Sequence, residues 1–405
     1  MAKLKEYRIK QSYFNIILTL VMLVVVIISV GIASVIIGKI KEKDKGGEYI
    51  PPTTQAQVST TPTTEDGTTD EYMPTIEEYY ALAMESFSSG EYIKALDSAY
   101  RVLDGEIEAS KKEEIIYKLA DVYVAANNHR AAYYLLQDCN VDGLLEKYCK
   151  EKTDLKFCLT KYTDPNDKSR FYMGYYPQTG YHSDELPEYV TEAAYNNDFA
   201  RIYGVEYTRL KVGGEYMYFV SEPVKWWIIK ETSASYTVVT DKLIDCKPFH
   251  NALTSVTWDT SALKIWTNTE FFNKCFNEKE AKLITEHTTP ASWNYYYEFT
   301  SGKATKDKVG IIPAPSLSDA THIFKDHDSA ESKALRKAMV TDYAVYQGAF
   351  TDEDGYGKWW TATAANKENW YSITVSFEGS ITVVTGGEAV NKSDICVRPY
   401  MTIKK

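Results

Sequence analysis

The longest apolar stretch of the chain lies near its N-terminus, where residues 15–38 contain no charged side chain. A helix of about 20 apolar residues crosses the roughly 30 Å of hydrocarbon in a bilayer, and only a helix bonds all of its backbone polar groups within one segment. A cleaved signal peptide is the alternative, but its apolar part is normally only about 7–15 residues long. The pattern therefore predicts an uncleaved transmembrane helix over residues 15–38, preceded by a cytoplasmic tail of residues 1–14.

Residues 39–73 are rich in threonine and proline and contain few large apolar side chains. Such a stretch cannot offset its conformational entropy by burial, so a disordered linker is predicted. Lysine and arginine flank the predicted span equally on both sides, and the positive-inside rule alone does not orient it. The short tail and the stalk-like linker favour a cytoplasmic N-terminus. The sequence therefore predicts a cell-membrane protein whose C-terminal part is extracellular.

A helical period dominates residues 74–155, where apolar residues recur three and four positions apart. The pattern breaks at Gly90 and Asn127, which lie 37 positions apart, and Ala83 and Ala120 show the same offset. This offset resembles the tetratricopeptide repeat, whose period is about 34 residues. It predicts tetratricopeptide-like helical hairpins, which serve either as a stiff spacer or as a peptide-binding groove.

The pattern changes over residues 156–405 to short β-branched runs separated by glycine and asparagine. Alternating apolar and polar positions over residues 371–377 are typical of a half-buried strand. A turn after them leads to a second strand at residues 381–384, which predicts a hairpin. Helical stretches at residues 260–285 and 329–340 lie between the strand-rich parts. Together these elements predict an α+β domain over residues 156–405.

Charge divides the chain in the same way as hydropathy. Residues 1–45 carry eight Lys/Arg and three Asp/Glu residues, whereas the whole chain has a net charge of −11, so the remainder carries −16. An acidic domain repels phosphate backbones, which argues against nucleic acid as a partner. The six cysteines are too few and too irregularly spaced for a disulfide scaffold. They contain no Cys-x-x-Cys pair, which argues against a structural zinc site. Buried free thiols are expected, and a single disulfide between two of Cys139, Cys149 and Cys158 is the alternative.

Short aromatic-rich motifs follow one another over roughly residues 157–403. They are residues 172–178, 224–229, 257–266, 271–272, 276–281, 308–312, 341–344, 359–362 and 397–401. This ordered set resembles a bacterial family described only as a domain of unknown function, number 6273, found largely in Gram-positive gut bacteria. The ending also resembles the C-type-lectin-like fold, which includes relatives of the sulfatase-modifying factors. That resemblance implies a ligand-side sheet made by a Trp-containing strand, a hairpin and a closing Val397-Arg398-Pro399 strand.

The sequence departs from the active members of these families. The sugar-binding triplets of calcium-dependent lectins are absent, and the reactive cysteine pair of sulfatase-modifying enzymes is reduced to Cys396. No phosphate loop, dinucleotide fingerprint or Gly-x-Ser-x-Gly elbow occurs. We therefore predict no catalytic residue, metal or cofactor, although a carboxylate pair of the glycosidase type stays open.

Aromatic side chains provide the candidate binding residues. The chain has 33 tyrosines and only 14 phenylalanines, and tyrosine combines a flat apolar face with a polar tip that suits recognition surfaces. The candidate ligand-binding residues are Trp293, Tyr295, Tyr297, Trp359, Trp360 and Trp370. Arg398 has two interpretations, a ligand contact or a buried fork that bonds backbone carbonyls. Its apolar flanks favour the structural interpretation.

These observations predict a multidomain, membrane-anchored binding or adhesion module of a Gram-positive bacterium. In this prediction a lectin-like head on a helical spacer binds a surface glycan or a protein. One alternative is a surface-tethered enzyme that acts on carbohydrate, and the missing catalytic motifs weigh against it. Another is an envelope scaffold that binds partner proteins through its helical repeats.

Overall fold

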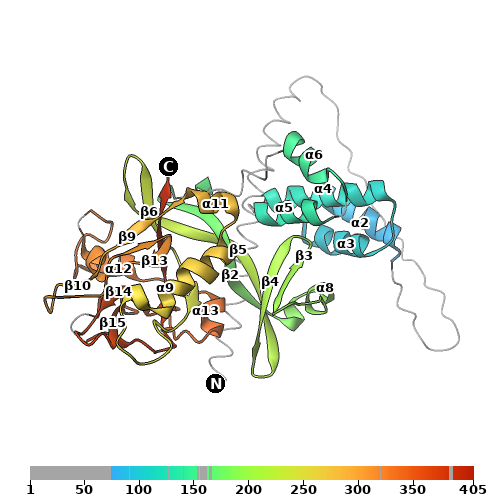
Figure 1. Ribbon diagram of the computed structural model, residues 1–405. Coiled ribbons are helices and arrows are strands. Elements are labelled where there is room, and N and C mark those ends of the chain that lie inside the picture. The colour runs from blue at the N-terminus through green and yellow to red at the C-terminus, as the bar shows by residue number, and fades with distance from the viewer. Residues whose placement is uncertain are drawn as a thin grey trace, which may run out of the picture. The chain divides into compact units, whose positions relative to one another are not determined.

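The computed structural model describes residues 74–405, apart from residues 91, 126–127, 140, 153–154, 156–161, 164–166, 320 and 383–385. The chain divides into two compact units, one up to Val122 and one from Tyr123 to Lys405. The described part of the first unit is helical, whereas the second combines short helices with antiparallel sheet (Figure 1).

The helices of the first unit begin and end where the sequence provides caps. They are α2 (Ile76–Ser89), α3 (Tyr92–Asp104) and α4 (Ala109–Ala125), whose last turn belongs to the second unit. Thr75 and Glu78 form a capping box at the start of α2. Gly90 ends α2 in the left-handed conformation, with φ 78°, which glycine adopts without steric cost. The chain then turns back, and α3 packs against α2 as a hairpin.

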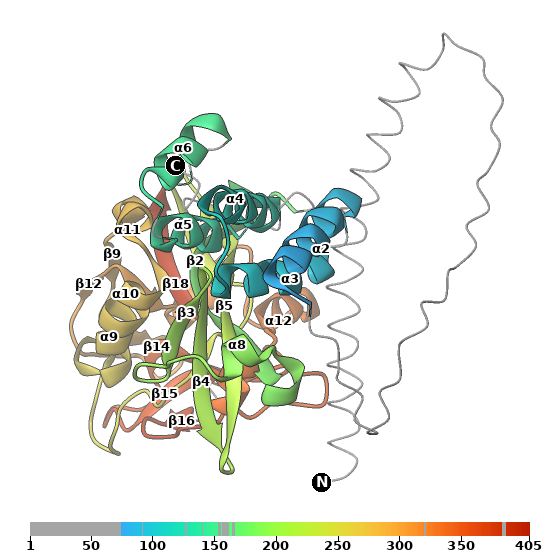
Figure 2. The same cartoon turned by 90° about the vertical axis from the view of Figure 1, so that its right-hand side faces the viewer.

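A nine-stranded sheet forms the framework of the second unit. Its main path runs β1-β2-β5-β6-β18-β13, while β4 pairs with β5 and β3, and β8 pairs with β18. The strands are β1 (Tyr162–Thr163), β2 (Arg170–His182), β3 (Phe199–Ile202), β4 (Val205–Val212), β5 (Glu215–Glu231), β6 (Ser235–Thr240), β8 (Ile284–Thr285), β13 (Val309–Ile311) and β18 (Pro399–Lys404). Irregularities interrupt the register of β5 with both β2 and β6. Bulges bend strands, and this antiparallel sheet is curled into a half-barrel (Figure 2).

A second sheet has the order β16-β15-β14-β17-β7, in which only the β14–β17 pair is parallel. Its strands are β7 (Asp245–Cys246), β14 (Trp359–Ala364), β15 (Tyr371–Val375), β16 (Glu388–Ala389) and β17 (Cys396–Val397). Two small hairpin-like pairs accompany it, β9 (His287–Thr289) with β12 (Thr305–Asp307), and β10 (Ser292–Asn294) with β11 (Phe299–Ser301).

Short helices cover these sheets. They are α5 (His129–Asp138), α6 (Leu144–Glu151), α8 (Glu188–Thr191), α9 (Ala262–Trp266), α10 (Phe272–Cys275), α11 (Glu278–Leu283), α12 (Ala330–Arg336) and α13 (Asp342–Tyr346). Helices α10 and α13 pack on β2, and α5 packs on β4 and α6. The core consists of two apolar clusters, and the neighbouring residues Trp359 and Trp360 belong to different ones. Every residue of β14 is buried. Because successive strand residues point to opposite faces, both faces of β14 are covered.

The structure does not bear out the prediction of a single-pass membrane protein. Among the described residues no helix is both long and apolar enough to cross a membrane, and the longest, α4, has 17 residues. The predicted span, residues 15–38, lies outside the described residues, as do the predicted tail, residues 1–14, and the linker, residues 39–73. No described helix therefore supports the predicted cell-membrane localisation with an extracellular C-terminal part.

The prediction of tetratricopeptide-like repeats is also wrong, since none is present among the described helices. The first predicted hairpin exists as α2 and α3, but α5 of the second packs on α6 and β4. Arg130 explains this difference, because its buried guanidinium donates to the Cys275 carbonyl and to Glu280. The helical period indicated which face of α5 is buried, but not that a sheet would cover it.

Among the described cysteines, Cys149, Cys246, Cys275 and Cys396 are free thiols. Cys158 lies outside the described residues. Burial raises the pKa of the Cys246 thiol to about 12, so this group stays protonated at neutral pH.

Candidate ligand-binding surface

The β10–β11 hairpin holds a run of aromatic residues on a short turn. Trp293 pairs with Thr300 across the two strands. At the turn the buried Asn294 side chain accepts hydrogen bonds from the backbone N–H groups of Tyr296, at 3.1 Å, and Tyr297, at 3.0 Å. Its amide nitrogen donates to the Ala364 carbonyl at 3.2 Å. One buried side chain therefore shapes the turn and ties it to the end of β14.

The aromatic side chains of this hairpin face solvent. Trp293 is 44% exposed and Tyr296 53%, and Tyr295 and Tyr297 are exposed as well. The rings of Tyr296 and Tyr297 meet edge to face, with centroids 5.2 Å apart. The Tyr295 ring packs edge-on against His327, with centroids 6.0 Å apart. These contacts limit the number of conformations that the rings can adopt.

Two further exposed aromatics lie at the start of β15, Trp370 just before the strand and Tyr371 as its first residue. Trp370 is 48% exposed, and Tyr371 is exposed beside it. The Asn366 side chain accepts from the backbone N–H groups of both residues, at 3.1 and 3.2 Å. As in the hairpin, an asparagine side chain fixes the turn that presents the aromatic rings.

The hairpin and the start of β15 flank the same end of β14. The Ala364 N–H donates to the Ser292 hydroxyl at 2.7 Å, and the Ala365 N–H donates to the Tyr371 carbonyl at 2.8 Å. Figure 1 shows β10, β14 and β15 next to one another at one end of the second unit. We refer to the exposed aromatic residues there as the aromatic surface, which consists of Trp293, Tyr295, Tyr296, Tyr297, Trp370 and Tyr371.

The structure separates the six aromatic residues that the sequence singled out. Trp293, Tyr295, Tyr297 and Trp370 belong to the aromatic surface, whereas Trp359 and Trp360 are both 0% exposed. The indole N–H of Trp359 donates to the Arg336 carbonyl, and that of Trp360 donates to the Lys247 carbonyl. These two residues are part of the core and offer no face to a ligand.

Two members of the aromatic surface, Tyr296 and Tyr371, were missed. Tyr296 lies inside a run of three consecutive tyrosines, and this run in a turn was a usable signal for exposure. Tyr371 was assigned to a half-buried strand by its alternation, and nothing in that pattern indicated that its ring stays exposed while the next four residues are buried.

Arg398 lies in the core and does not reach the aromatic surface. Its Nε donates to the Thr240 carbonyl at 2.9 Å and a terminal nitrogen donates to the Arg336 carbonyl at 3.1 Å. Burial lowers the pKa of the guanidinium to about 10, which leaves it charged at neutral pH. This is the geometry that the structural interpretation of Arg398 requires.

Within the described part of the chain, no three His, Cys, Asp or Glu side chains are placed to hold a metal ion. The acidic turn at Asp352 is shaped by its own backbone, since its carboxylate accepts from the N–H groups of Asp354 and Tyr356. The rings of the aromatic surface themselves offer apolar stacking, and the tyrosine hydroxyl groups offer hydrogen bonds.

Comparison with known proteins identifies one family. The family described as Domain of unknown function (DUF6273) matches residues 224–405. This confirms the predicted resemblance to family 6273 over residues 224–405, while the stretch from 157 to 223 lies outside the match. No curated protein and no solved structure matches the chain.

Proposed function

We propose that the second unit is a binding module whose aromatic surface stacks against the sugar rings of a glycan. The observation that supports this most is the exposure of six aromatic side chains on two turns at one end of the second sheet. Clustered apolar surface that stays exposed in a folded protein commonly marks a binding site. Its burial by a ligand would contribute about 25 cal/mol for each Å² removed from water.

The way in which these rings are held also supports binding. Asn294 and Asn366 bond the backbone of their turns, so the rings are largely oriented before a ligand arrives. A preorganised surface loses less conformational entropy on binding. Tryptophan and tyrosine are also the residues that most often anchor interfaces.

A glycan array probed with the full chain tests this function. We expect binding to a subset of glycans, and we expect Trp293→Ala combined with Trp370→Ala to weaken it about tenfold or more, because an anchoring aromatic residue contributes roughly 2 kcal/mol. Phe350→Ala is the matched control, since Phe350 is exposed and packs on Phe377 outside the aromatic surface. That control should bind like the wild type.

The same array separates binding from catalysis. Glycans that are retained without chemical change support a binding module, whereas released or shortened glycans would indicate an enzyme that acts on carbohydrate. If the double variant binds as tightly as the wild type, the aromatic surface is not the glycan site.

A further inference from the structure

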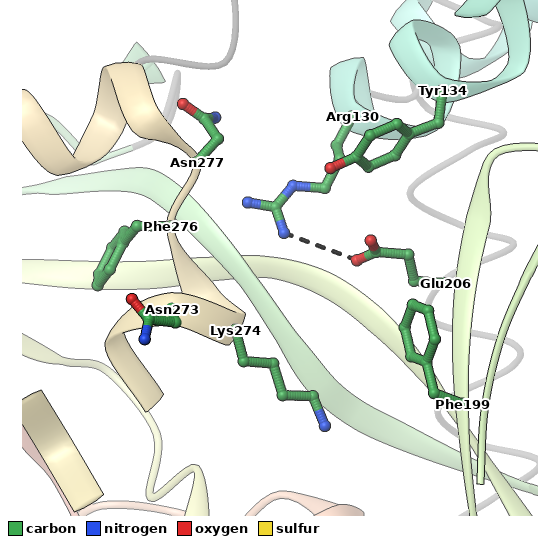
Figure 3. A pocket seen from close by; sticks show the side chains of 8 residues that line it. All are labelled: Arg130, Tyr134, Phe199, Glu206, Asn273, Lys274, Phe276 and Asn277. Carbon is green, nitrogen blue, oxygen red and sulfur yellow. Dashed lines mark ion pairs between the residues drawn. The ribbon is translucent and has the colours of Figure 1, made fainter. Parts of the chain in front are cut away.

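A hollow of about 390 Å³ lies between α5, β3, β4, α10 and the segment that follows α10 (Figure 3). Its charges are balanced within the protein, since Arg130 forms ion pairs with both Glu206 and Glu280. The Lys274 ammonium points away from the Arg130 guanidinium, so the two cations do not converge on one point (Figure 3). This hollow therefore presents no combined charge to a ligand, whereas two buried thiols of the same unit do converge.

Cys246 and Cys396 face each other across two neighbouring strands of the second sheet. They are direct register partners in the antiparallel pair of β7 and β17. Both belong to the same apolar cluster, which places their side chains on the same face of the sheet. The Cys396 N–H donates to the Lys358 carbonyl at 2.8 Å, and the Cys246 N–H donates to the Asp245 carboxylate at 2.7 Å. Because neither N–H bonds the opposite cysteine, this is a non-hydrogen-bonded pair, in which cross-strand side chains lie closest.

The spacing of such a pair suits a covalent bond between the two sulfur atoms. The Cα atoms of a non-hydrogen-bonded pair are about 4.5 Å apart, and disulfides join Cα atoms that are about 4.4–6.8 Å apart. The Cys246 sulfur lies 3.1 Å from the Ser393 carbonyl oxygen and 3.5 Å from that of Ile395, the residue before Cys396. A rotation of the Cys246 side chain about its Cα–Cβ bond turns this sulfur toward Cys396 without a change in the strands.

The two thiols differ in their access to solvent. Cys246 is 5% exposed and Cys396 is 0% exposed. The backbone of Gly357 covers the Cys396 sulfur, since a Cβ at this glycine would lie 3.0 Å from it. Burial raises the pKa of Cys246 to about 12 and that of Cys396 well above its ordinary value. Because the thiolate is the reactive form, the pair reacts slowly in the closed sheet, and Cys246 is the first to react when β7 opens locally.

We propose that Cys246 and Cys396 are a redox-active pair that a small disulfide compound, such as oxidised glutathione, converts into a cross-strand disulfide. The Cys246 thiolate attacks the sulfur–sulfur bond of the oxidant, forms a mixed disulfide and releases one thiol. The Cys396 thiolate then attacks the Cys246 sulfur and releases the second thiol. The two cysteines lose two electrons and two protons, and the oxidant takes up both and becomes two thiols.

This bond has a structural consequence for the aromatic surface. Strands β7 and β17 have only two residues each, so few backbone hydrogen bonds hold them together. Cys246 and Cys396 enclose residues 247–395, which contain all six residues of the aromatic surface. A disulfide between them closes this long loop, which restricts the unfolded chain and thereby stabilises the folded one. The reduced and oxidised chains therefore differ in stability, whether or not the aromatic surface binds glycan.

Peptide mapping of the full chain tests the proposal directly. The chain is incubated with oxidised glutathione in mild denaturant, the remaining thiols are alkylated, and the peptides are identified by mass spectrometry without reduction. We expect one cross-linked pair of peptides that contains Cys246 and Cys396 and disappears on treatment with dithiothreitol. The oxidised chain should melt several degrees above the reduced chain.

Three variants show whether this rise belongs to the pair. Cys246→Ala and Cys396→Ala should each melt at the same temperature with and without the oxidant, a comparison in which the cost of the substitution itself cancels. Cys275→Ala is the matched control, because Cys275 is a buried free thiol of the other apolar cluster. It should keep both the cross-link and the rise in melting temperature.

The map of the wild type does not depend on whether a variant folds. Free thiols at Cys246 and Cys396 after incubation, glutathione bound to either one without a cross-link, or a cross-link from either one to a different cysteine would each overturn the proposal. Equal melting temperatures of the oxidised and reduced wild type would do the same.

Discussion

Two arginine side chains, Arg336 and Arg398, lie in the core with backbone carbonyls as their hydrogen-bond partners. Arg336 donates to the carbonyls of Gly379, Leu317, Asp326 and His327, at 2.6 to 3.0 Å. Its own carbonyl accepts from both Arg398 and the Trp359 indole. A planar guanidinium with five donors can bond several chain segments at once, which a lysine ammonium cannot do with the same geometry.

We expect Arg398→Ala to destabilise the second unit by about 3–5 kcal/mol, since removing one member of a buried charged network leaves its partners unpaired. Its melting temperature should fall by several degrees. Arg398→Lys should restore little of this loss, because the ammonium does not reproduce the fork. Thermal melts of the three proteins measure the effect. An Ala variant that melts like the wild type but no longer binds glycan would instead make Arg398 a ligand contact.

The tryptophans show what the sequence could and could not predict at this scale. Residue type alone does not distinguish the exposed indole of Trp293 from the buried indole of Trp360. Trp359 and Trp360 are adjacent, and adjacency in a strand normally places one residue outside. Both are buried because a separate apolar cluster covers each face of β14. The residues that cover the second face come from segments distant in sequence, so no local pattern indicates that this face is buried.

At the scale of elements, the local sequence predicted where helices and strands end better than it predicted which elements they pack against. The Gly90 break and the stretches at residues 329–340 and 371–377 correspond to the end of α2, to α12 and to β15. The antiparallel bridge between Val375 and Ile381 and the hydrogen bond from the Thr382 N–H to the Thr374 carbonyl match the predicted hairpin over its described residues. Caps and periods depend on neighbours in sequence, whereas the packing of α5 on β4 depends on contacts from a different part of the chain.

The turn between β3 and β4 lets us test how closely α5 and the sheet must approach. Gly204 has φ 85°, and a Cβ there would lie 2.1 Å from the Ala131 carbonyl oxygen of α5. Gly204→Ala should therefore cost several kcal/mol, because the helix must move away from the turn. Gly213→Ala is the matched control, since Gly213 has φ 63° but open space around its Cβ position. It should cost only about 1 kcal/mol.

Chemical denaturation of both variants measures these two costs. The control accounts for the left-handed backbone, so the difference between the variants reports the clash with α5. Equal losses of stability would show that α5 does not rest on this turn.

At the scale of the whole molecule, Arg130 connects α5 to the strand-rich part of the chain. Its guanidinium bonds the buried Glu280, whose carboxylate also accepts from the Gly174 N–H of β2. Burial raises the pKa of Glu280, and the neighbouring Arg130 counteracts that rise. A domain boundary at residue 156, where the sequence pattern changes, would separate these two charges.

We therefore expect a fragment of residues 123–405 to unfold in one cooperative transition. A fragment of residues 156–405 should be less stable by about 3–5 kcal/mol, because it leaves Glu280 buried without its cation. Comparing the thermal melts of the two fragments with that of the full chain measures this difference. Equal melting temperatures for the two fragments would place the boundary at 156 and make α5 dispensable.

The position of β18 in the large sheet has a consequence for synthesis on the ribosome. This strand, Pro399–Lys404, lies between β6 and β13 and also pairs with β8. Chains emerge from the ribosome N-terminal end first, so β6, β8 and β13 are all released before the strand that joins them. Until then they carry unpaired edges that can associate with other chains. The closing step must therefore follow translation of residue 404, and a nascent chain that stalls earlier is a candidate substrate for chaperones.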